Sequence, residues 1–123
     1  MKPERRRSAR LNVQIPATVK HSDAKTQQAT IKDISGHGMR LAMPGVVELG
    51  TRFAIEVPLP ARKKPVTVQA EVVWSRPVDA PASGAAPASA EAGVKFVELH
   101  PKDRVLLMLY ARLKTIPPSS IIP

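Results

Sequence analysis

From residue 11 onward, apolar and polar positions alternate with a period of two. Leucine, valine, isoleucine or alanine stands at every odd position from 11 to 19, and polar residues or proline fill the even positions. Because successive side chains of a strand point to opposite faces, this pattern predicts a strand over residues 11–20 with one buried face. Pro16 lies on the polar side, which indicates a sheet edge or a bulge there.

Five further segments repeat the alternation over shorter lengths and are separated by polar, glycine or proline residues. They predict strands over residues 26–35, 39–43, 52–58, 66–74 and 93–99. Six short strands followed by one helix indicate an all-β fold, either a small antiparallel barrel or a sandwich, with the helix across one side.

The helix is predicted to begin at Pro101 and Asp103 and to continue to about residue 115. Its apolar residues are spaced three and four apart and form one broad face: Val105, Leu106, Leu109, Leu113 and Ile116. We expect this helix to pack on the strands or on a partner.

The chain divides into an arm, one folded unit and a tail. Residues 1–10 predict a flexible basic arm, residues 11–116 the β-fold with its helix, and residues 117–123 a short tail. Within the folded unit, residues 76–92 are rich in alanine, proline and serine, and we expect a flexible loop there because few bulky side chains could order it.

Charge indicates what the arm meets. The formal net charge is +9, and five basic residues against one acidic residue give +4 within the first ten positions. This concentration indicates an anionic partner, although a solvated tail that aids solubility is the alternative.

The composition also excludes several classes of protein. The absence of cysteine excludes a disulfide scaffold, and the three histidines share no metal-ligand spacing. No apolar run reaches membrane-spanning length, so we expect a cytoplasmic protein without membrane insertion.

The stretch 30–41 carries the candidate chemistry. Asp33 and Ser35 would stand on one face of a strand, just before a turn containing Gly36 and Gly38. A carboxylate beside a hydroxyl can accept paired N–H donors from a planar ligand, and the glycines would let that ligand approach closely. The alternative is a hairpin turn in which both side chains bond local backbone.

Nothing in this arrangement predicts catalysis. The sequence offers no acid–base pair, no phosphate-cradling loop before a helix, and no histidine placed to activate Ser35. The residues therefore predict a binding module for an anionic partner rather than an enzyme.

Two motifs in order, Arg6-x-x-x-Arg10 and Asp33-x-Ser35-x-x-Gly38, resemble those of the PilZ domain family. The segments 70–74, 93–97 and 101–104 agree with this resemblance, which covers roughly residues 4–115. The resemblance implies a six-stranded antiparallel barrel with a C-terminal helix. It also implies a receptor for the bacterial second messenger cyclic di-GMP, without enzymatic activity. We expect no metal and no further cofactor.

The resemblance also implies roles for these residues. Arg6 and Arg10 would bind phosphate and the O6/N7 edge of guanine, Asp33 would accept from guanine N1–H and N2–H₂, and Ser35 would add a neighbouring hydrogen bond. Gly38 would permit the turn and the close approach. Two further cations of the arm, Arg5 and Arg7, could let a stacked pair of ligands bind.

Ligand binding would then order the arm and change a surface read by a downstream protein. The alternative within the family is an adaptor of the pilus or motility machinery that binds protein and no nucleotide. A nucleic-acid-binding barrel is disfavoured by the shortage of aromatic residues. The apolar helix could also form a homodimer contact.

Overall fold

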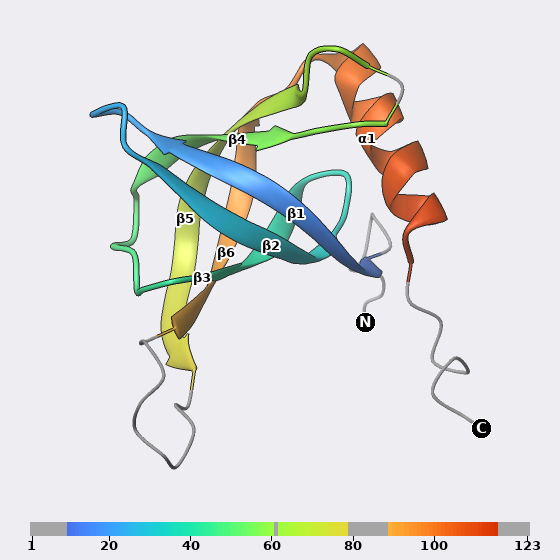
Figure 1. Cartoon of the computed structure of the whole chain (residues 1–123). Coiled ribbons are helices and arrows are strands. Elements are labelled where there is room, and N and C mark those ends of the chain that lie inside the picture. The colour runs from blue at the N-terminus through green and yellow to red at the C-terminus, as the bar shows by residue number, and fades with distance from the viewer. Residues whose placement is uncertain (1–9, 61, 79–88, 116–123) are drawn as a thin grey trace, which may run out of the picture.

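The computed structural model describes residues 10–60, 62–78 and 89–115. Its strands are β1 (Leu11–His21), β2 (Thr26–Ile34), β3 (Gly38–Met43), β4 (Arg52–Val57), β5 (Val66–Val78) and β6 (Ser89–Glu98), followed by helix α1 (Pro101–Leu113). The strands close into a barrel in the order β1-β2-β3-β6-β5-β4, with every neighbouring pair antiparallel. Figure 1 shows the barrel with α1 beside it. The predicted six-stranded antiparallel barrel with one helix is confirmed, and the sandwich alternative is wrong.

The alternating residues of the strands fill the barrel. In β1, the odd positions from 13 to 19 are at most 2% exposed, while the residues between them are exposed or half-buried. The same alternation buries Phe53, Ile55 and Val57 on β4 and the even positions from 66 to 72 on β5. Burial of these aliphatic side chains, at about 25 cal/mol per Å² of apolar surface, is the main force that closes the sheet.

Both ends of the segment 76–92, predicted to be a flexible loop, are strands instead. Strand β5 continues to Val78 and β6 already begins at Ser89, and these ends pair through Arg76↔Glu91 and Pro77↔Ala90. Residues 90–92 also pair with β3 on their other side. Backbone hydrogen bonds to two neighbours order this segment, so bulky side chains are not needed, and the expectation from composition was wrong at both ends. The rest of the predicted loop, residues 1–9 of the predicted arm at 1–10, and the tail at 117–123 lie outside the described residues.

Helix α1 begins with a regular cap and presents a different face from the one expected. The His100 side chain accepts from the Lys102 N–H at the N-cap, and Pro101 occupies the first turn, where its missing N–H costs nothing. The buried residues of α1 are Leu107 and Ala111. The described residues of the predicted apolar face point to solvent instead: Val105, Leu106, Leu109 and Leu113. Ile116 of that face lies outside the described residues, and the helix ends at Leu113 rather than near residue 115.

Candidate functional site

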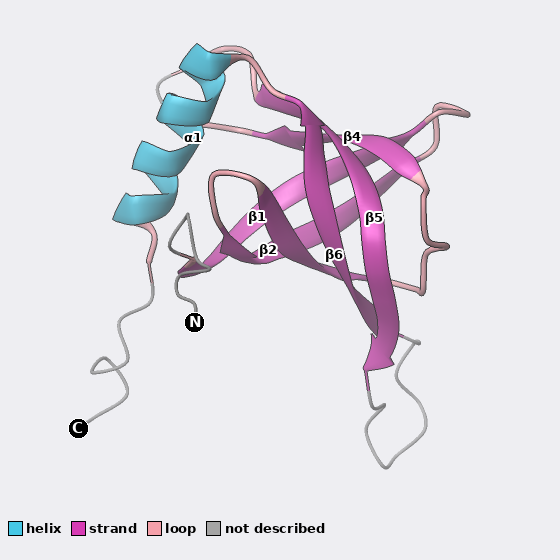
Figure 2. Cartoon of the chain, turned by 180° about the vertical axis from the view of Figure 1, so that it is seen from behind, coloured by secondary structure: helices cyan, strands magenta, loops and turns pink. Residues whose placement is uncertain are grey.

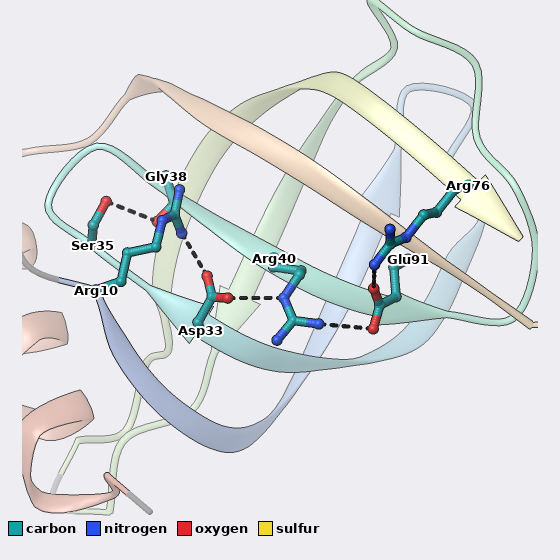
Figure 3. Close-up of polar contacts among 7 residues, drawn as sticks. All are labelled: Arg10, Asp33, Ser35, Gly38, Arg40, Arg76 and Glu91. Atoms are coloured by element: carbon teal, nitrogen blue, oxygen red, sulfur yellow. Dashed lines mark hydrogen bonds and ion pairs between the residues drawn. The ribbon is translucent and has the colours of Figure 1, made fainter. Parts of the chain in front are cut away.

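Asp33 is the buried carboxylate around which the site is built. It lies next to the last residue of β2, and 9% of its surface is exposed. Arg10, directly before β1, donates from Nη1 to Oδ1 at 2.5 Å, and Arg40 on β3 donates from Nε to Oδ2 at 2.8 Å (Figure 3). Each carboxylate oxygen therefore has a cationic donor, which offsets the cost of burying the charge.

The ion pairs continue from Arg40 onto the neighbouring strands. Arg40 Nη1 donates to Oε2 of Glu91 on β6 at 2.8 Å, and Glu91 Oε1 accepts from Arg76 Nη2 on β5 at 3.1 Å (Figure 3). The guanidinium carbon of Arg76 lies 5.5 Å from the ring centroid of Trp74, within cation–π range. A chain of alternating charges thus connects the residue that precedes the barrel to an aromatic ring on β5.

Arg40 is the centre of this chain, and its charge is held firmly. Its hydrogen bond to the Asp33 carboxylate is the largest effect on its pKa, and the nearby charges of Asp33 and Glu91 act in the same direction. Together they outweigh partial burial and raise the pKa of Arg40 above its ordinary value. The guanidinium is therefore charged at neutral pH.

A cavity of about 220 Å³ opens beside Asp33. Its lining combines three charged residues with apolar and aromatic ones: Arg10, Asp33, Met39, Arg40, Val73, Trp74, Gly93 and Val94. Pockets for drug-sized ligands are larger, about 300–1,000 Å³, so this cavity fits one planar ring with polar edges rather than a whole dinucleotide. Carboxylate oxygens, guanidinium donors and an indole ring are the groups that such a ring needs.

Trp74 lies in the cavity because the residue across from it has no side chain. Trp74 pairs with Gly93 on β6, directly after a bulge in β5, and its indole packs on the glycine backbone. A Cβ atom on Gly93 would come within 2.1 Å of the indole nitrogen. Trp74 as a residue is 38% exposed and is thus accessible from the solvent.

We expect Gly93→Ala to push the Trp74 indole out of its present position. The clash is with a large ring, so the substitution should lower the free energy of unfolding by about 1–3 kcal/mol. Trp74 is the sole tryptophan of the chain, and its fluorescence spectrum therefore reports the displacement directly. Gly45→Ala is the matched control because nothing lies within 4 Å of its Cβ position. An unchanged emission spectrum for Gly93→Ala would contradict the predicted packing.

The turn between β2 and β3 uses its own polar groups. The Ser35 N–H donates to the Gly38 carbonyl at 2.9 Å, the Ser35 hydroxyl donates to the same oxygen at 3.4 Å, and Ser35 Oγ accepts from the His37 N–H at 3.2 Å. Local bonding, the alternative from the sequence, therefore describes Ser35 in this structure but not Asp33, which is paired with two arginines.

Gly38 permits a close approach, but to another strand. A Cβ atom at this position would lie 2.4 Å from the Val94 carbonyl oxygen on β6. Its φ is not positive, and the described glycine with a left-handed φ is Gly50. The lack of a side chain at Gly38 thus lets β3 and β6 pair beside the cavity.

The turn is also tied to the last strand and to the helix. The Phe96 N–H donates to the His37 carbonyl at 2.8 Å, and Arg104 on α1 donates from Nη1 to the Gly36 carbonyl. The segment that follows Asp33 is therefore fixed by β6 and α1 together.

The structure brings two of the predicted site residues, Arg10 and Asp33, into direct contact and places Ser35 and Gly38 in the adjoining turn. The predicted residues Arg5, Arg6 and Arg7 lie outside the described residues. The structure adds four residues to the site for which the sequence predicted no role: Arg40, Trp74, Arg76 and Glu91. One signal was present for the first of these, because a hairpin that pairs Ile34 with Met39 necessarily sets Asp33 opposite Arg40.

Within residues 10–60, 62–78 and 89–115, no three His, Cys, Asp or Glu side chains gather in a way that could hold a metal ion. In the same part of the chain, no helix is long and apolar enough to cross a membrane.

The chain as a whole matches a known family. The model of the PilZ domain matches residues 4–112, which includes the arm motif, the barrel and nearly all of α1. The chain belongs to the PilZ domain family. No curated protein matches it in sequence.

Solved structures resemble this PilZ domain in fold. The PilZ domain of YcgR from Escherichia coli, solved with c-di-GMP, has a TM-score of 0.67 and 20% sequence identity, over 89% of this chain and 92% of that one. The Bacillus subtilis inhibitor of motility MotI/DgrA has a TM-score of 0.66 and 16% sequence identity, over 92% of this chain and 52% of that one. The K. pneumonia MrkH–c-di-GMP complex has a TM-score of 0.64 and 16% sequence identity, over 90% of this chain and 52% of that one. This chain therefore spans about half the length of the latter two proteins.

Proposed function

We propose that this PilZ domain is a cytoplasmic receptor for cyclic di-GMP, not an enzyme, and that ligand binding signals to a downstream protein. The observation that carries the proposal is the Asp33 carboxylate, buried at the edge of the cavity and held by arginines from two sides. Two of the similar structures, those of YcgR and MrkH, are complexes with c-di-GMP, which supports the same ligand class here.

A ligand can displace Arg10 from the Asp33 carboxylate more easily than Arg40. The Arg10 side chain is 54% exposed and bonds one oxygen, whereas the Arg40 side chain is 30% exposed and is also anchored to Glu91. A guanine that presents N1–H and N2–H₂ can take over Oδ1 from Arg10 while Arg40 keeps Oδ2 in place. Arg10, once released, is free to bind a phosphate or the O6/N7 edge of guanine.

Trp74 gives the cavity a stacking surface for the base. Stacking of a nucleobase on an aromatic ring contributes about 1–3 kcal/mol. Because the cavity accommodates one ring, the phosphates and the second guanine lie outside it, where we place the arm. Arg6 with Arg10 forms the basic motif in this proposal, Arg5 and Arg7 supply further cations, and Ser35 and Gly38 hold the turn against the ligand.

We expect calorimetric titration with cyclic di-GMP to give saturable binding with a Kd of about 1 μM or below, and GTP to give none at the same concentrations. Arg10→Ala should weaken binding about 10- to 100-fold, since one charge-assisted hydrogen bond is worth about 1.5–3 kcal/mol. Quenching of Trp74 fluorescence in parallel would place the base in the cavity.

Arg112→Ala is the matched control, an exposed arginine on α1 outside the cavity. The absence of both heat and a thermal shift at about 100 μM ligand would remove the receptor proposal. The adaptor that binds protein alone, the alternative from the sequence, would then remain.

A further inference from the structure

Four large apolar side chains between Val105 and Leu113 are exposed on the solvent side of α1. The exposed fractions are 58% for Val105, 39% for Leu106, 56% for Leu109 and 83% for Leu113, while Leu107 and Ala111 on the other side are fully buried against the barrel. Figure 2 shows α1 lying along one side of the barrel, with no described strand over its far side. A surface helix ordinarily turns polar residues to water, so this face, which we call the outer face of α1, is suited to contact with another molecule.

The spacing of the outer face fits a helix as its partner. Val105, Leu109 and Leu113 follow one another at intervals of four, and Leu106 completes an i, i+3, i+7 series with the last two. Residues at these intervals form a ridge more than two turns long, which can pack into the groove of a second amphipathic helix.

The charges near the outer face of α1 indicate the charge of the partner helix. The exposed charged residues of α1 and its cap are the cations Lys102, Arg112 and Lys114. The one carboxylate of the helix, Asp103, is half-buried and paired with Arg62 at 3.4 Å. A second copy of this chain would set like charges against one another, whereas an acidic partner would complement them.

We propose that the outer face of α1 is a docking site for an acidic amphipathic helix of a protein partner. Through this face, a change in the proposed ligand site could alter the binding of another protein. Arg104, on the barrel side of α1, donates to the carbonyl of Gly36 in the turn that follows Asp33. Any shift of this turn on ligand binding reaches α1 through that bond, and this second step rests on the proposed function.

The test is a fluorescence anisotropy titration of the full chain with a labelled synthetic helix. The probe carries leucine at i, i+3 and i+7 positions and glutamate elsewhere; a shuffled peptide of the same composition has no apolar face. We expect saturable binding of the amphipathic peptide at least about tenfold tighter than that of the shuffled one. Leu109→Gln should weaken it about tenfold, the loss typical of one buried leucine contact.

Leu49→Gln is the matched control, since Leu49 is 68% exposed in the connection between β3 and β4. The docking site would be overturned if both peptides bound equally or if neither bound at about 100 μM. It would also be overturned if Leu109→Gln and Leu49→Gln weakened peptide binding equally. Sedimentation velocity tests whether a second copy of the chain occupies the face, and flotation with anionic vesicles tests whether a lipid surface does. A dimer or a vesicle-bound form that Leu109→Gln abolishes would overturn the choice of an acidic helix.

Cyclic di-GMP added to the peptide titration tests the coupling separately. We expect it to change the peptide affinity at least twofold, and Arg104→Met to remove that change while peptide binding remains. If calorimetry finds no cyclic di-GMP binding, the proposed function fails, while the peptide result still stands for the docking site. If the ligand binds and the peptide affinity does not change in wild type, the coupling is overturned.

Discussion

Asp33→Asn is expected to weaken cyclic di-GMP binding at least about 100-fold. In the proposed complex, Oδ1 of the carboxylate accepts from guanine while Oδ2 still accepts from Arg40. The amide of asparagine replaces one of these two acceptors with a donor, which opposes either the ligand or Arg40. The loss of one charge-assisted contact and the creation of one repulsive contact together correspond to about 3 kcal/mol. Calorimetry of the variant beside wild type measures this directly.

The same substitution should also lower stability, because Arg10 and Arg40 lose their shared anion. We expect the free energy of unfolding in urea to fall by about 1–3 kcal/mol. Asp23→Asn is the control: the Asp23 side chain is 60% exposed, and its pairing with Lys25 is loose at 4.0 Å. A variant that loses stability but binds cyclic di-GMP as wild type does would restrict Asp33 to a structural role.

Arg40→Met is expected to cause the largest loss of stability at the site. The substitution leaves the carboxylates of Asp33 and Glu91, whose side chains are 13% and 16% exposed, without the guanidinium between them. Breaking a fully buried pair costs about 3–5 kcal/mol, and the partial exposure of Arg40 reduces this to about 2–3 kcal/mol. The melting temperature should fall by about 10 °C, measured by circular dichroism.

A second substitution separates lost charge pairing from lost packing. In the Arg40→Met background, Asp33 keeps Arg10 and Glu91 keeps Arg76, but both carboxylates lack the cation between them. Glu91→Gln neutralises one of these two carboxylates, so the double variant should recover about 1 kcal/mol. Arg52→Met is the matched control, since the Arg52 side chain is 68% exposed beside Glu71 and should change stability by less than about 1 kcal/mol. Equal losses for Arg40→Met and Arg52→Met would contradict the importance of the network.

The contribution of Arg40 should not depend on pH near neutrality. Its pKa is raised in the folded protein, so the stabilisation is fully present below the ordinary pKa of arginine and is lost only as the pH rises through the higher folded value. The difference in stability between Arg40→Met and wild type that arises from ionisation of Arg40 itself is therefore constant from slightly acidic to slightly basic pH.

The sequence by itself determined the strands, the single helix, the β-fold and the motif residues Arg10 and Asp33. Alternation with a period of two is a local property of the chain, and so is the spacing of the two short motifs. Where local composition competed with pairing, as at residues 89–92, the sequence was misleading, because hydrogen bonds from β3 and β5 order a segment with small side chains.

Only the tertiary structure decided which side chains meet. The contact of Asp33 with Arg40, the continuation to Glu91 and Arg76, and the position of Trp74 over Gly93 depend on strand order and register across the closed barrel. The direction of α1 was decided in the same way: its apolar residues surround the helix, and the docking of Leu107 and Ala111 on the barrel leaves Leu109 in solvent. Periodicity shows that a helix has an apolar face, but with apolar residues on both sides, only packing against the barrel determines which side is buried.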